Sequence, residues 1–140
     1  MTKAGKLRLC NWSLLVAVIS VLASGLWLEA VGGGDMRWVP VHMAIAAVFV
    51  SLAVVHIGLH FGYGGWFVRF GKVRSRVTMA LWVVFLLTLF SALAASIHWS
   101  LWRGHSPIGG VHGKIGLVMV GIAIVHIVSR IGFFRRRVRR

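Results

Sequence analysis

Four long apolar runs divide the charged residues of this 140-residue sequence into short blocks, and this division leaves little choice of fold. The runs cover residues 12–31, 39–61, 77–101 and 111–134. Each is close to the roughly 20 residues that cross a hydrocarbon core, and backbone groups in lipid must be satisfied within their own segment. We therefore expect one domain over residues 1–140, an all-α membrane protein built as an up-down-up-down bundle of four transmembrane helices. Residues 32–35 and 106–110 are expected to form turns.

The basic residues indicate how the helices are oriented. Of the 16 Lys and Arg residues, thirteen lie in the N-terminal segment, the middle loop and the C-terminal end, which share one side of the bilayer. The other side has three, Arg37, Arg103 and Lys114. Because positive charge marks the cytoplasmic side, we expect a multi-pass protein with both termini in the cytoplasm. The first helix follows a basic segment, as a signal peptide does, but its apolar run is longer than a usual signal sequence.

The net charge of +14 does not by itself indicate a nucleic-acid partner. The basic residues lie between and after the apolar runs, where such blocks set topology and contact anionic lipid headgroups. We therefore expect the lipid bilayer as a partner and no nucleic acid. Cys10 is the only cysteine, so the chain has no internal disulfide and lacks the paired thiols of thiol-oxidising membrane enzymes.

The sequence repeats itself at an offset of 70 residues. Val41-His42 matches Val111-His112, and Val55-His56-Ile57 matches Val125-His126-Ile127. The first and third helices match more weakly, through the similarity of Ala23-Ser24-x-x-Trp27 to Ala95-Ser96-x-x-Trp99. This pattern predicts a duplicated helical hairpin whose halves are related by an axis along the membrane normal.

Four histidines follow this repeat with one spacing. His42 and His56 are 14 residues apart, and so are His112 and His126. At about 100° per residue, 14 steps return a helix to within about 40° of its starting direction, so each pair lies on one helix face. The rise over 14 residues is roughly 21 Å, which places one histidine of each pair near each edge of the hydrocarbon core.

The second and fourth helices run in the same direction because a full hairpin separates them. His42 and His112 are then expected at one level, the outer site, and His56 and His126 at the other, the inner site. Two facing imidazoles can bind a haem iron from both sides, and neutral imidazole adds no charge to a low-dielectric interior. The pattern therefore predicts two stacked bis-histidine haem sites with these four histidines as metal ligands. A lone histidine in a membrane helix can also be a hydrogen-bonded packing residue.

Other polar residues near the membrane edges leave alternatives open. His60 could replace His56 as a ligand, contact a haem propionate or lie at the wet interface. His98 and His105 could line a quinone or partner site, or simply be solvated. Five cations could pair with propionates, although topology alone also explains them. They are Arg37, Arg103 and Lys114 for the outer haem, and Arg69 and Arg130 for the inner haem.

Two ligand helices carry a resemblance to a known family. The first reads Val41-His42-Met43 and then Val55-His56-Ile57-Gly58-Leu59-His60-Phe61, followed by Trp66, and the second contains His112 and His126-Ile127. Over most of its length the chain resembles the flavinylation-associated four-helix di-haem cytochromes b. The 14-residue pairs are also similar to the di-haem core of cytochrome b from quinol-oxidising complexes.

The resemblance implies haem b at His42/His112 and at His56/His126, in a prokaryotic cytoplasmic membrane. It also implies electron passage to or from extracytoplasmic partners that carry flavin or haem. The superoxide-oxidising and b561-type four-helix cytochromes are a looser match, because they usually place a ligand on the first helix. The first helix of this chain has no histidine.

These observations leave three functions open. Transmembrane electron transfer, to or from quinone and a redox partner, is favoured by the histidine pattern. A quinone-coupled oxidoreductase in its own right would use the region of His98, Arg103 and His105. A non-haem transporter or metal carrier would need membrane carboxylates or soft ligands, and Glu29 is the only acid in a predicted span. The sequence leaves the oligomeric state open, a homodimer included.

Overall fold

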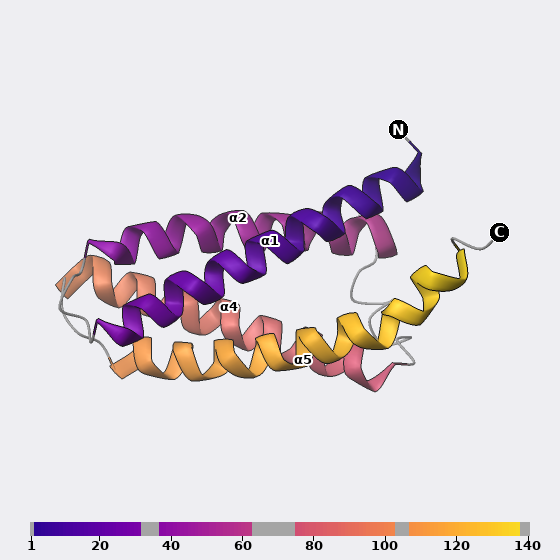
Figure 1. Cartoon of the computed structure of the whole chain (residues 1–140). Coiled ribbons are helices and arrows are strands. Elements are labelled where there is room, and N and C mark those ends of the chain that lie inside the picture. The colour runs from indigo at the N-terminus through magenta and orange to yellow at the C-terminus, as the bar shows by residue number, and fades with distance from the viewer. Residues whose placement is uncertain (1, 32–36, 63–74, 103–106, 138–140) are drawn as a thin grey trace. The chain divides into compact units, whose positions relative to one another are not determined.

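The protein is described by a computed structural model that covers residues 2–31, 37–62, 75–102 and 107–137, with side chains as far as Arg130 in the last range. The regular elements in these residues are four long helices (Figure 1). They are α1 (Lys3–Ala30), α2 (Trp38–Phe61), α4 (Arg76–Trp102) and α5 (Pro107–Arg137). The prediction of an all-α chain with four long apolar helices is confirmed.

Two helices begin several residues earlier than the apolar runs predict, and the other two begin one residue earlier. Helix α1 begins at Lys3 rather than at residue 12, and the Thr2 hydroxyl caps it by accepting a hydrogen bond from the Gly5 amide at 3.3 Å. Helix α5 begins at Pro107, so the expected turn at 106–110 is wrong for residues 107–110. Proline is favoured in the first helical turn because its missing N–H has no partner there anyway. The turn expected at 32–35 lies outside the described residues.

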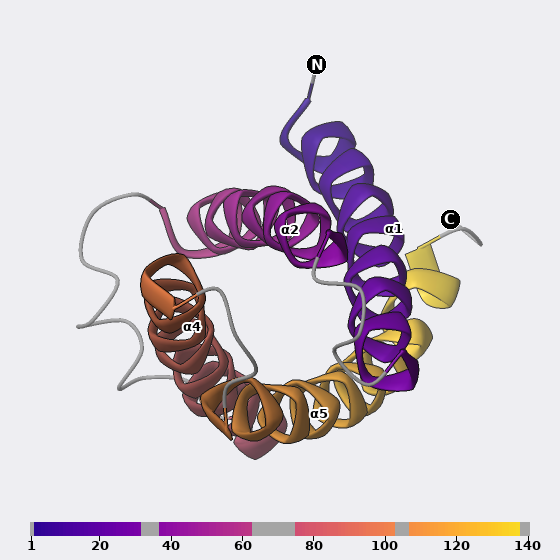
Figure 2. The same cartoon turned by 90° about the vertical axis from the view of Figure 1, so that its left-hand side faces the viewer.

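The first compact unit, Met1–Lys72, contains the α1–α2 hairpin. The two helices lie side by side in both views (Figures 1 and 2). The indoles of Trp27 and Trp38 meet edge to face, with ring centroids 6.2 Å apart, at the end near the connecting segment. Towards the other end, the Cys10 thiol contacts the Leu52 carbonyl oxygen at 3.7 Å. These contacts fix an antiparallel register.

The second compact unit, Val73–Arg140, contains the α4–α5 hairpin, whose helices also pack side by side (Figure 2). Its two cross-helix polar contacts join Ser91 to His112 and Thr78 to His126. Ser91 follows Thr78 in α4, whereas its partner His112 precedes His126 in α5. This hairpin is therefore antiparallel too. Each unit thus has a histidine-bearing helix and a neighbour that presents hydroxyl groups to it.

All four helices are long and apolar enough to cross a membrane. Large apolar side chains remain exposed along them, for example Trp12 at 64%, Phe90 at 66% and Leu101 at 66%. Continuous apolar surface of this extent marks a surface that is covered by lipid or by another protein.

Candidate haem-ligand sites

Three of the four predicted ligand histidines are contacted by a hydroxyl at the same ring nitrogen. Ser24 Oγ lies 2.8 Å from His42 Nδ1, and Ser91 Oγ lies 3.0 Å from His112 Nδ1. Thr78 Oγ1 lies 3.5 Å from His126 Nδ1. In each case the hydroxyl comes from the partner helix of the same hairpin. The imidazoles are therefore contacted at Nδ1 by the neighbouring helix, and Nε2 is the nitrogen predicted to ligate a metal.

Helix α1 approaches the His42 ring very closely. A methyl group placed on Gly25 would lie 3.4 Å from His42 Cε1 and 3.9 Å from Nδ1. A longer side chain at this position would enter the space that the ring occupies. Gly25 and Ser24 are adjacent, so one short stretch of α1 provides both the room for the imidazole and its hydrogen-bond partner.

His56 has a different neighbour within its own helix. Its ring lies 4.7 Å from the ring of His60, one turn further along α2, with an angle of 57° between the ring planes. His56 is half-buried and His60 is exposed. The structure therefore brings together the predicted inner ligand and the residue that could replace it, and the choice between them stays open.

The ligand helices are continuous through both histidine positions. Helix α2 runs without a break from before His42 to beyond His56, and α5 does the same for His112 and His126. The expected rise of about 21 Å between the histidines of each helix therefore applies. The two histidines of each predicted site lie in different compact units, so their pairing stays a prediction.

Three of the five cations expected near propionates lie in described residues, and all three are exposed. Arg37 stands at the start of α2, five residues before His42, and Lys114 follows His112 by two residues. Arg130 lies four residues after His126 on α5. Arg69, Arg103 and the histidine His105 lie outside the described residues. A role of any of these cations at a propionate stays a prediction.

His98 is the remaining histidine in the described ranges. It is half-buried on α4, and its ring lies 4.8 Å from the Trp102 ring. Its Nδ1 atom is buried and has no hydrogen-bond partner among the described residues. A buried ring nitrogen ordinarily has a partner, so a turn of the ring towards a molecule docked at this end of α4 would satisfy it.

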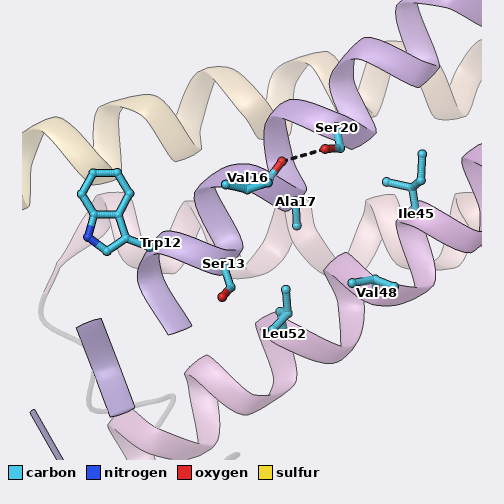
Figure 3. A pocket seen from close by; sticks show the side chains of 8 residues that line it. All are labelled: Trp12, Ser13, Val16, Ala17, Ser20, Ile45, Val48 and Leu52. Atoms are coloured by element: carbon cyan, nitrogen blue, oxygen red, sulfur yellow. Dashed lines mark hydrogen bonds between the residues drawn. The ribbon is translucent and has the colours of Figure 1, made fainter. Parts of the chain in front are cut away.

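A groove of about 530 Å³ opens on the first hairpin (Figure 3). Its lining residues are Trp12, Ser13, Val16, Ala17 and Ser20 from α1, and Ile45, Val48 and Leu52 from α2. The Ser20 hydroxyl donates to the Val16 carbonyl at 3.0 Å, so its proton is already used (Figure 3). With no charged group among its lining residues, the groove suits a hydrocarbon chain better than a polar ligand.

The hydroxyl groups at the histidines were not expected as site residues. The weak sequence match pairs Ser24 with Ser96, but the contacts pair Ser24 with Ser91, since these are the two serines that face His42 and His112. In the sequence this register appears only as an offset of 67 residues, which pairs Ser24 with Ser91 and another polar residue of α1, Asn11, with Thr78.

The predicted donor set at each site consists of two histidines. No three His, Cys, Asp or Glu side chains gather into an ion site within the residues that the structure describes. A bis-histidine haem needs only two protein ligands, since the porphyrin supplies the other four nitrogens. Comparison of the chain with protein-family models, with curated proteins and with solved structures finds no match.

Proposed function

We propose that the chain is a transmembrane electron-transfer cytochrome that holds two b-type haems, one between His42 and His112 and one between His56 and His126. The supporting observation is local to each hairpin. The histidines lie 14 residues apart in continuous helices of membrane length, and hydroxyl groups contact Nδ1 of three of them. Metal-ligating histidines are ordinarily held in this way, with one nitrogen bonded to the protein and the other to the metal.

The chemistry of the residues suits this role. Neutral imidazole ligates iron without adding charge to an apolar interior. Bound haem would supply one-electron transfer at its iron, and the protein supplies the ligands, their spacing and the surrounding polarity. Two histidine levels about 21 Å apart along the helices would provide redox sites at two depths of the bilayer.

The proposal includes a location and partners. The chain would be a four-helix bundle in a prokaryotic cytoplasmic membrane, with both termini cytoplasmic and lipid around its exposed apolar side chains. Electrons would pass between quinone or a cytoplasmic-side donor and an extracytoplasmic protein that carries flavin or haem. The partners follow from the resemblance to the flavinylation-associated cytochromes, and the membrane location is supported by the four apolar helices.

A second candidate function is a quinone-coupled oxidoreductase that completes a reaction by itself. The observation that favours it is the buried Nδ1 of His98 beside Trp102, where a quinone carbonyl could bond to the ring. Purified protein that reduces a quinone analogue with a small reductant, and loses this activity on His98→Ala with its haems intact, would favour this function over simple electron transfer.

The proposed ligand pairing is tested by single histidine variants and reduced-minus-oxidised absorption spectra. His42→Ala and His112→Ala should each remove the same haem and leave the other, whereas His56→Ala and His126→Ala should remove the second. His60→Ala is the matched control on α2, because His60 is exposed and one turn from His56. Loss of different haems from His42→Ala and His112→Ala would refute the pairing. If His60→Ala removes a haem and His56→Ala does not, His60 is the inner ligand.

A further inference from the structure

The hydrogen bonds of Ser24 define which nitrogen of His42 carries the proton. Ser24 Oγ donates to the Val21 carbonyl oxygen at 3.0 Å and also lies 2.8 Å from His42 Nδ1. A serine hydroxyl has one proton and two lone pairs, and a carbonyl oxygen can only accept. With the Ser24 proton on the Val21 carbonyl, the contact with His42 is made by Nδ1–H donating to Ser24 Oγ.

The second hairpin repeats this arrangement. Ser91 Oγ donates to the Thr88 carbonyl oxygen at 3.0 Å and lies 3.0 Å from His112 Nδ1. The same placement of the proton makes His112 Nδ1–H the donor, and the Thr88 carbonyl oxygen is a second acceptor beside this ring. The two histidines of the predicted outer site therefore have the same tautomer. In each case a serine on the partner helix of the same hairpin accepts the hydrogen bond.

We infer that Ser24 and Ser91 are positioning residues that hold His42 and His112 in the Nδ1–H tautomer, with Nε2 unprotonated for the iron of the haem that these histidines are proposed to share. The inference rests on the proposed function for its ligand. The hydrogen bond also has an electronic effect, because an acceptor at Nδ1–H makes the imidazole a more basic ligand. A more basic ligand favours ferric over ferrous iron, so each serine lowers the reduction potential of this haem.

The predicted inner site provides an internal comparison. Thr78 Oγ1 lies 3.5 Å from His126 Nδ1, at the outer limit of a hydrogen bond, whereas both serine contacts are at ordinary hydrogen-bond distances. Loss of a serine hydroxyl should therefore change the haem at the outer site and leave the other haem unchanged. A general loosening of the bundle would change both.

The tautomers can be measured first, on the haem-free full-length protein in detergent micelles with ¹⁵N-labelled histidine. The ¹⁵N shifts should show His42 and His112 protonated at Nδ1, with assignments from the two His→Ala variants. Ser24→Ala should move the proton of His42 towards Nε2 and leave His112 unchanged. Ser91→Ala should leave His42 unchanged and weaken the preference of His112 for Nδ1–H, because the Thr88 carbonyl oxygen remains as an acceptor. Ser24→Thr keeps a hydroxyl and should restore the wild-type tautomer. Protonation at Nε2 in the wild-type protein would overturn the inference.

The electronic effect is then measured by redox titration of the haem-loaded protein. Ser24→Ala and Ser91→Ala should each raise the midpoint potential of one haem, the one lost in His42→Ala. A tenfold change in the preference for ferric over ferrous haem corresponds to about 59 mV for one electron. Ser20→Ala and Ser100→Ala are matched controls, because each loses only a bond to a carbonyl of its own helix and should leave both potentials unchanged.

The outcomes separate this inference from the proposed function. If the wild-type protein binds no haem, the proposed function fails, and the tautomer measurement still decides the role of the serines. If the protein binds two haems and Ser24→Ala leaves both the tautomer and the potentials unchanged, the inference fails and the proposed function stands. A shift of both haems by equal amounts would contradict the site-specific role.

Discussion

At the scale of single residues, the His42 ring depends on two neighbours in α1 that provide different things. Ser24 provides a hydrogen-bond acceptor and Gly25 provides space, since even a methyl group there would touch the ring at 3.4 Å. Ser91 repeats the first of these roles for His112. The close approach of the ring disfavours a side chain larger than alanine at position 25, whereas the backbone, which is helical there, does not call for glycine.

Gly25→Val should weaken haem binding at the outer site. The added methyl groups would displace the His42 ring and break its bond to Ser24, and disturbed partners of a metal ligand typically cost about tenfold to a hundredfold in affinity. Haem titration followed by absorbance should show one weakened site and one unchanged site. Gly121→Val is the control, because a methyl group at Gly121 meets nothing within 4 Å. Equal losses from both variants would contradict the assignment.

The serines could not be selected from the sequence by residue type. Serine in a helix commonly bonds to a carbonyl one turn back, as Ser20, Ser51, Ser100 and Ser129 all do here. Ser24 and Ser91 make the same bond and differ only in what lies across the hairpin. The histidines, in contrast, are distinct in the sequence, because imidazoles are rare in apolar helices and their spacing repeats.

At the scale of helices, the apolar runs predicted which segments are helical but not where each helix begins. Helix α1 extends back to Lys3 because its first residues form helix well and Thr2 caps them, although they are too polar for hydrocarbon. Helix α5 includes Pro107 and Gly109, which usually signal turns, because proline fits a first helical turn. Helices α2 and α5 are unbroken through both histidine positions. The 14-residue spacing therefore places the two histidines of each helix on one face.

One alanine inserted between Val48 and Phe49 of α2 should separate the two histidine levels. The insertion turns His56 by about 100° relative to His42, so the two rings no longer share a face. We expect one haem per chain in place of two, measured as haem content per protein. The same alanine inserted after Gly62, beyond the end of α2, should leave both haems in place. Retention of two haems by the first variant would show that the face relation is unimportant.

At the scale of the whole molecule, the repeat predicted two hairpins, and the structure divides into two units that each contain one. The sequence predicts the pairing of histidines between the units only through the expected directions of the helices, because the geometry of each pair depends on how two separately packed hairpins meet. The predicted orientation in the membrane is also a property of the whole molecule, because it depends on the distribution of charge over all the loops.

Both termini should lie on the cytoplasmic side of the membrane. A fluorescent protein that matures only in the cytoplasm, fused after Arg140, should be fluorescent in cells, and a phosphatase that is active only outside the cytoplasm should be inactive at the same position. The physical reason is that thirteen basic residues are expected on this side and three on the other. The reverse pair of results would invert the topology and exchange the names of the outer and inner sites.

The proposed function requires that the four histidines bind two haems, and the number of haems per chain is the quantity to measure. The protein is expressed in haem-replete cells, purified in detergent and assayed for haem b and for protein by amino-acid analysis. We expect two haems b per chain, with the absorption of low-spin, bis-histidine iron in both redox states. A chain that is well folded and helical but remains colourless, even after addition of haem, would contradict it.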